Sequence, residues 1–407
     1  MSRDITILHD LAARYVDICN QLVNDERRDL WRRHNSLERT RPLVLCNWLA
    51  TWYEAAESKT ECEDPFYRAH ETWLRQRLFQ DSIGDDQIFE PFITQRASLY
   101  SPPHSHWGVP YGRIRGDVPG GSWKNDPPLH NLRDLSMLAA PRHEVNEEAT
   151  ARNVARLQDA VGDLLEVSVD RAPLWSGWNA DISTDLGYIR GIDTFMLDMY
   201  DDPEGLHKLV GWMRDGILRV QDEAEAAGDW SLCNHNNQAM CYAKELQGPK
   251  ANTPCKREDL WVFFSAQEFT LVSPRMHDEF LLQYQISLMS RFGLSAYGCC
   301  EDLTEKIDML RQIPNLRRIG VTPRADVRRS AEQIGEDYVF SWRPNPSEMI
   351  CCGFDPEHVR KVVRDAMEAS KGCHVDITLK DVQTVEHDTS RLRRWVETVR
   401  SVTDDYA

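Results

Sequence analysis

The stretch that decides the fold runs from residue 293 to residue 342 and reads GLSAYGCCEDLTEKIDMLRQIPNLRRIGVTPRADVRRSAEQIGEDYVFSW. Its three apolar segments, 293–299, 316–321 and 338–342, have the length of buried strands. Between them, apolar side chains recur every three or four residues, which is typical of an amphipathic helix. Short strands joined by helices predict parallel strands connected by right-handed crossovers.

The same alternation extends in both directions from this stretch. Three acceptor–proline pairs, Asp202-Pro203, Ser273-Pro274 and Asp355-Pro356, each predict the start of a helix. The other candidate strands are PLVLCNWL at 42–49, IFEPFI at 88–93, SLCNH at 231–235, EFTLV at 268–272 and HVDITL at 374–379. The pattern favours an α/β fold, a (β/α)8 TIM barrel. A doubly wound open sheet is the alternative, although no glycine-rich phosphate-binding loop follows any candidate strand.

The chain divides into an N-terminal helical extension, residues 1–40, and a barrel domain, residues 41–407. Within the barrel domain, residues 100–130 are dense in proline, glycine and aromatic residues and show no period. We expect this insertion to form an ordered lid over the barrel mouth that brings Trp107 near a ligand. A loop that contacts a second subunit is the alternative.

Composition excludes several classes of partner. The 407 residues carry 48 Lys and Arg against 65 Asp and Glu, a net charge of −17, which argues against nucleic acid and anionic membranes. The N-terminus lacks the apolar segment of a signal peptide, and no run of 18 apolar residues predicts a membrane span. Eleven cysteines without a CxxC motif suit reduced thiols in a cytoplasmic enzyme.

The segment YGCCED at 297–302 is the strongest chemical signal. In a barrel the active site lies where the strands end, and this segment follows a predicted strand. The thiolates of Cys299 and Cys300 are soft ligands that suit zinc, and a carboxylate can complete the shell. Simple packing of two buried cysteines is an equally weighted alternative.

Other predicted strand ends supply acid–base and binding candidates. The catalytic candidates are Glu268, Glu301, His235 and Asp381. The substrate-binding candidates are Arg343, Asn345, Trp342, Tyr297, Lys380, Trp48 and Trp107. Arg343 suits a ligand carboxylate or phosphate, with an internal ion pair as the alternative. The alternative to a catalytic role for His235 is a structural hydrogen bond. The alternative to a functional role for Lys380 and Asp381 is an internal salt bridge.

From Asp202 to the C-terminus the chain resembles the uroporphyrinogen decarboxylase superfamily, including its cobalamin-dependent methyltransferase branch. It looks most like members with a YGCCE-type segment. The segments that carry the resemblance are DDPEGLHKLVGWM (201–213), SAQEFTLVSPRMHDEFLLQY (265–284), SAYGCCEDLTEKIDML (295–310), IGVTPRADVRRSAEQIG (319–335) and YVFSWRPNPSEMI (338–350). The resemblance implies a (β/α)8 barrel with its site at the C-terminal mouth.

Two departures from that superfamily bear on the chemistry. Its decarboxylases carry an arginine-rich motif near the first strand, where this chain reads PLVLCNWLATWYEA. Its zinc methyltransferases carry His-x-Cys where this chain has Tyr297-Gly298-Cys299. They carry a further cysteine near the position that Lys380-Asp381 occupies in this chain. By resemblance, a metal site here would combine Cys299 or Cys300 with Asp381 and with Glu268 or Glu301, or the metal is lost.

The resemblance implies an enzyme that moves a methyl group from a small substrate to a corrinoid. The substrate would be an O- or N-methyl compound, possibly aromatic, and zinc or a protein acid would polarise its leaving atom. No DxHxxG segment is present, so the corrinoid would arrive on a separate protein. One alternative is a metal-independent lyase or decarboxylase acting on a small carboxylated substrate, and another is an inactive ligand-binding barrel. We expect a homodimer.

Overall fold

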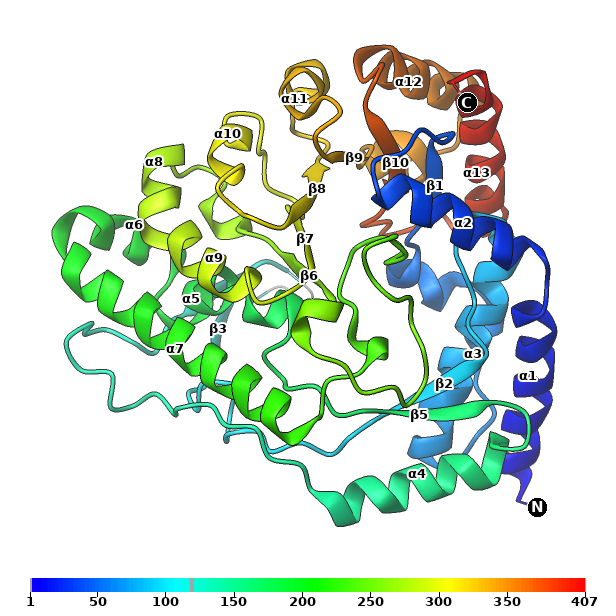
Figure 1. The fold of residues 1–407 in the computed structure, drawn as a ribbon, viewed down its shortest axis with the longest axis horizontal. Helices are drawn as coiled ribbons and strands as arrows, with labels where there is room; N and C mark the ends of the chain where they lie inside the picture. The colour runs from blue at the N-terminus through cyan, green and yellow to red at the C-terminus, as the bar shows by residue number, and fades with distance from the viewer. Residues whose placement is uncertain (1, 118–120, 407) are drawn as a thin grey trace.

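A curved parallel sheet of six strands forms the centre of the molecule, as Figure 1 shows for a computed structural model that describes residues 2–117 and 121–406. Its strands lie in the order β1-β10-β9-β8-β7-β6. They are β1 (Leu43–Cys46), β6 (Trp261–Phe264), β7 (Leu294–Tyr297), β8 (Leu316–Val321), β9 (Val339–Trp342) and β10 (His374–Leu379). All pairs run parallel, as the alternation of strand and helix predicted.

Two further strands, β2 (Phe92–Arg96) and β5 (Glu166–Asp170), pair in parallel with each other. Within the described ranges, no ladder joins β1 to β2 or β5 to β6. The fold is therefore a mixed α/β fold with a curled half-barrel, and the closed eight-stranded barrel expected from the sequence is not formed by strand pairing.

Another part of the chain fills the open side of the half-barrel. The segment 231–260, green in Figure 1, runs between the curved sheet and the β2–β5 pair. The side-chain amide of Asn35 donates to the carbonyls of Met240 and Tyr242, each at 2.8 Å. Tyr242 also packs in one apolar cluster with Leu43 of β1. On the side of β1 where the neighbouring strand of a closed barrel would pair, the backbone N–H of Asp86 donates to the Val44 carbonyl at 2.8 Å. The carboxylates of Asp86 and Asp85 accept from the N–H groups of Val44 and Cys46.

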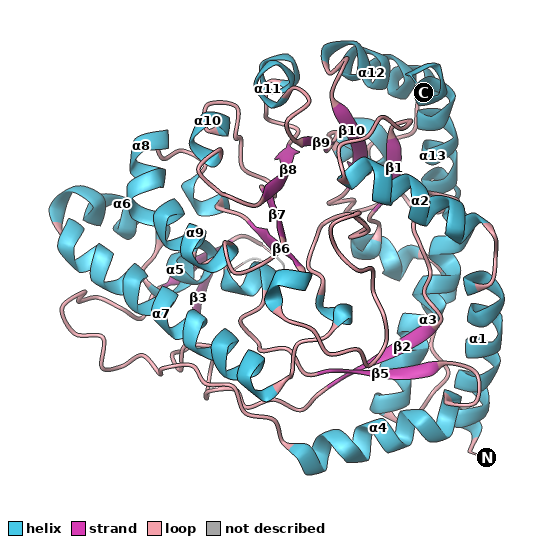
Figure 2. Ribbon diagram, viewed as in Figure 1, coloured by secondary structure: helices cyan, strands magenta, loops and turns pink. Residues whose placement is uncertain are grey.

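Helices lie around the curved sheet and around the β2–β5 pair (Figure 2). They are α1 (Arg3–Cys19), α2 (Val23–Asn35), α3 (Pro65–Ile83), α4 (Glu147–Val161), α5 (Ser183–Ile189), α6 (Ile192–Asp201), α7 (Pro203–Ala227), α8 (Pro274–His277), α9 (Gln283–Met289), α10 (Ile307–Leu310), α11 (Val327–Ile334), α12 (Pro356–Ala369) and α13 (Ser390–Thr403). No helix among the described residues is long and apolar enough to cross a membrane.

The three predicted helix starts are confirmed. Asp202 accepts a hydrogen bond from the backbone N–H of Gly205, three residues on, at 3.1 Å. Ser273 and Asp355 cap α8 and α12 in the same way. Each cap satisfies a backbone donor that the first helical turn leaves free, and the proline that follows has no donor to satisfy.

Two predicted strands are wrong. Residues 231–235 and 268–272 contain the short 3-10 turns Leu232–Asn234 and Gln267–Phe269 instead. Leu271 is 88% exposed, so the second segment lies in the loop after β6 rather than inside the sheet. The strands β5 and β6 were not predicted. All four residues of β6 are buried. Its sequence therefore lacks the alternation of apolar and polar residues by which a half-buried strand is recognised.

An ion pair ties α2 to the inner face of the sheet. Arg318 of β8 donates to the carboxylate of Asp376 on β10, and both side chains are fully buried. Ser341 of β9 donates to Asp376 at 2.8 Å, and His34 of α2 lies 3.2 Å from it. Burial alone raises the pKa of Asp376, but the charge of Arg318 and the contacts with His34 and Ser341 together outweigh burial and hold that pKa at about 2. The pair therefore links β8, β9 and β10 to the N-terminal helices.

The insertion at 100–130 contains a hairpin, β3 (Gly112–Arg115) with β4 (Trp123–Asp126). Residues 118–120, between the two strands, lie outside the described residues. Trp107 is fully buried against Trp175 and Trp212, with ring centroids 5.8 and 5.4 Å apart. The segment before the hairpin is therefore anchored in the main core.

Candidate functional site

Two cysteines and a lysine meet at the carboxyl ends of β7 and β10. Lys380 Nζ lies 3.2 Å from Cys299 Sγ and 3.1 Å from Cys300 Sγ. It also lies 3.2 Å from a carboxylate oxygen of Asp381. The two sulfur atoms are 3.6 Å apart. The residues predicted from two distant strand ends are thus brought together around one ammonium group.

The surroundings of Cys299 favour its thiolate. A hydrogen bond from Cys300 and the positive charge of Lys380 lower the pKa of Cys299 to about 6, against the effect of burial. The Gln238 side-chain amide also donates to Cys299 Sγ, at 3.3 Å. The same contact and burial raise the pKa of Cys300, which therefore remains a thiol that donates to its neighbour. At neutral pH the site holds a thiolate–ammonium pair.

This arrangement does not fit zinc. A zinc ion would have to lie about 2.3 Å from each sulfur, but the Lys380 ammonium already contacts both sulfurs and has no lone pair to donate. In the described ranges, no group of three His, Cys, Asp or Glu side chains is placed to hold a metal ion. The donor set of Cys299, Cys300 and Asp381 is therefore paired with a lysine cation.

We expect protein purified without chelators to carry far less than stoichiometric zinc at these thiols, because binding would require Lys380 to leave. Atomic emission spectroscopy measures the metal, and Cys299→Ser is the control. Zinc near one equivalent in the native chain, lost in Cys299→Ser, would contradict this expectation.

Arg343 holds the loop that carries the cysteines. It is buried, and its Nη1 donates to the carbonyls of Gly298 at 2.6 Å and Cys299 at 2.8 Å. Gly298 has a φ of 102°, which glycine adopts readily. A Cβ at Gly320 would lie 2.6 Å from Arg343 Nη1, so the guanidinium needs a glycine there. Arg343, predicted to anchor a substrate, contacts the backbone of the site.

Glu301 holds the same loop from the other side. Its buried carboxylate accepts hydrogen bonds from the backbone N–H groups of Ala266, Cys299 and Cys300, at 2.8 to 2.9 Å. These contacts occupy both oxygens. The residue, predicted to be catalytic, positions the two thiols in this structure.

Three carboxylates form a second cluster beside the end of β6. Glu268 accepts a hydrogen bond from Ser183 at 2.7 Å, and Asp181 accepts one from Ser265 at 2.8 Å. Burial raises the pKa of both, and also that of Asp185 on α5. Such carboxyls can retain a proton near neutral pH and act as acids. Asp181 and Asp185 were missed because they follow no predicted strand.

His235 and Tyr297 are tied into local hydrogen bonds. His235 accepts from the backbone N–H of Trp261 at 3.2 Å and donates to the Gln247 carbonyl at 2.9 Å. Burial lowers its pKa to about 4, so it is neutral at pH 7. Tyr297 is buried and donates to Gln285 at 2.6 Å. Neither residue contacts the cysteine pair.

The remaining binding candidates are dispersed. The buried tryptophans among them are Trp48, Trp107 and Trp342. Trp107 donates to Asp185 at 2.6 Å, which attaches the 100–130 insertion to the acidic cluster. Trp48 donates to Gln80. Asn345 accepts from the backbone of Ser347 at 3.1 Å and so caps the following turn.

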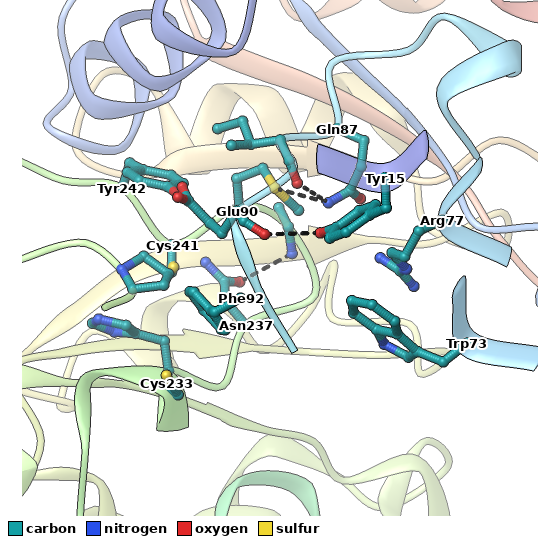
Figure 3. Close-up of a pocket in the computed structure, with 15 residues that line it drawn as sticks. Tyr15, Trp73, Arg77, Gln87, Glu90, Phe92, Cys233, Asn237, Cys241 and Tyr242 are labelled. Carbon is teal, nitrogen blue, oxygen red and sulfur yellow. Dashed lines mark hydrogen bonds between the residues drawn. The ribbon is translucent and has the colours of Figure 1, made fainter. Parts of the chain in front are cut away.

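Two neighbouring cavities adjoin the site. The smaller, about 170 Å³, lies at the ends of β1 and β10 and includes Gln238, which contacts Cys299. The larger, about 370 Å³, reaches the residues before β2 (Figure 3). The two share lining residues, which are Arg77, Gln87, Asn237, Ala239 and Met240.

Comparison with known proteins finds a similar structure but no similar sequence. No protein-family model matches the sequence, and no curated protein does. Among solved structures, the chain is similar to a methyltransferase from Methanosarcina mazei, with a TM-score of 0.51 and 11% sequence identity. The two chains share a fold. The match covers 93% of this chain and 98% of the other, so the likeness extends over most of both chains.

Proposed function

We propose that this chain is a methyltransferase that moves a methyl group from a small O- or N-methyl substrate to a separate corrinoid protein. The observation that carries the proposal is the Lys380 ammonium held by two thiols and Asp381 at the carboxyl edge of the sheet. The likeness in fold to a methyltransferase supports it.

Removal of a methyl group leaves negative charge on the oxygen or nitrogen that carried it. Lys380 has a raised pKa because Cys299, Cys300 and Asp381 outweigh burial and the nearby Arg343, so it stays protonated until that charge develops. As the carbon–heteroatom bond breaks, Lys380 Nζ gives its proton to the leaving atom and later regains one from water. The corrinoid, when present on its own protein, supplies the nucleophile that accepts the methyl group.

Free cob(I)alamin, whose absorbance changes on methylation, can replace the partner in a test. With a panel of methoxyaryl and N-methyl compounds, we expect methylation of cob(I)alamin only when the chain is present. Lys380→Met should lower kcat at least about a hundredfold, because it removes the proton donor. Lys371→Met, which removes an exposed lysine just beyond α12, is the matched control. Full activity in Lys380→Met would contradict the assignment.

The acidic cluster favours a second candidate, a metal-independent lyase. Protonated Glu268 or Asp181 could supply a proton to a carbanion left by loss of carbon dioxide. Carbon dioxide released from a carboxylated substrate alone, with no methyl acceptor added, would support this reaction and contradict methyl transfer.

A further inference from the structure

Arg77 of α3 carries a charge without a counter-ion in the wall shared by the two cavities. Among the described residues, no carboxylate lies within 4 Å of its guanidinium, and its buried Nε has no hydrogen-bond partner. In Figure 3 its nitrogen-bearing end lies between the rings of Tyr15 and Trp73. The Trp73 ring, 5.6 Å from the guanidinium carbon, offers only a cation–π contact.

The nearby carboxylates already have partners. Asp85 accepts from the backbone N–H of Cys46 at 2.9 Å and from Gln80 at 2.7 Å. Glu90 forms an ion pair with Arg28 at 2.9 Å. Because a half-buried cation without a counter-ion is costly, the cavity wall is complementary to an anion that the protein itself does not supply.

Two more polar atoms of residues that line the smaller cavity lack partners within the described ranges. They are Asn237 Nδ2, a donor, and Gln238 Oε1, an acceptor. Gln238 uses its other side-chain atom to donate to Cys299 Sγ. A ligand in the smaller cavity would therefore contact a side chain that also holds the reactive thiolate.

We propose that these cavities bind a small monocarboxylate with an aromatic or apolar body, with its carboxylate on Arg77 and its body near Asn237 and Gln238. This inference rests on the proposed function and names its substrate class. The guanidinium fork matches a carboxylate, and one uncompensated charge balances a monoanion better than a dianionic phosphate. Tyr15, Trp73, Phe92 and Tyr242 line the larger cavity and provide the apolar contact.

Calorimetric titration with benzoate, benzamide and inorganic phosphate tests the proposal on the full chain. We expect benzoate to bind more tightly than benzamide or phosphate. In Arg77→Met the Kd of benzoate should rise about tenfold or more, while that of benzamide stays unchanged. Arg32→Met, which removes an exposed arginine of α2, should leave both unchanged and controls for net charge.

Without ligand, Arg77→Met should melt no lower than the native chain, since the variant removes a half-buried charge that has no counter-ion. Equal benzoate affinity in Arg77→Met and the native chain, no benzoate binding, or tighter phosphate binding would overturn the proposal. If Arg77→Met does not fold, Arg77→Gln, which keeps a polar side chain but removes the charge, must weaken benzoate instead. The binding measurement does not depend on methyl transfer, so the two proposals can fail separately. A protein that binds benzoate but transfers no methyl group would contradict only the methyltransferase function. A protein that transfers methyl groups only from uncharged substrates would contradict only the carboxylate site.

Discussion

Arg318→Leu is expected to lower the free energy of unfolding by about 3–5 kcal/mol, because it leaves the carboxylate of Asp376 buried without its cation. Denaturant unfolding followed by circular dichroism measures the change. Arg324→Leu removes an exposed arginine just beyond β8 and should change stability by no more than about 0.5 kcal/mol. The double variant Arg318→Leu/Asp376→Leu should recover much of the loss, since an apolar pair replaces the ions.

The same ion pair predicts how stability depends on pH. The pKa of Asp376 is about 2 in the folded chain and about 3.9 when unfolded, so its contribution is complete above pH ~4. It is lost as the pH falls from about 4 to about 2, and amounts to about 2–3 kcal/mol. Arg318→Leu should lack this acid-dependent loss. An unchanged acid profile in that variant would contradict the role given to the pair.

The thiol of Cys299 is expected to titrate near pH 6, about two and a half units below an ordinary cysteine. Lys380→Met removes the adjacent positive charge and Cys300→Ala removes the donated hydrogen bond, so each should move the midpoint upward toward about 8.5. At that limit, the thiolate fraction at pH 7 falls from about nine-tenths to a few per cent.

The rate of iodoacetamide alkylation as a function of pH measures this midpoint, and mass spectrometry of the tryptic peptide 292–306 assigns it to the pair Cys299 and Cys300. The Cys299→Ser variant shows how much alkylation comes from the remaining cysteines. Lys371→Met is the control for Lys380→Met and should leave the midpoint near pH 6. A native midpoint near 8.5 would show that Cys299 is an ordinary thiol and that Lys380 does not hold a thiolate.

Local sequence patterns determined the regular elements of the C-terminal half. The strands β7 to β10 were predicted because each is a short apolar run, and the helices after Asp202, Ser273 and Asp355 because a capping side chain acts within three residues. Such signals depend on neighbours in the chain. The segment 268–272 has strand-like composition, yet it lies past the end of β6, where no neighbouring strand pairs with it.

The sequence by itself also placed Cys299, Cys300 and Lys380 at strand ends, but only the tertiary structure decided what they form. Two strands, β8 and β9, separate β7 from β10 in the sheet. Because the sheet curls, side chains from non-adjacent strands meet across its mouth, and a lysine takes the position expected for a metal. Asp181 and Arg77 gave no sequence signal, because their properties arise from burial, which depends on contacts distant in the chain.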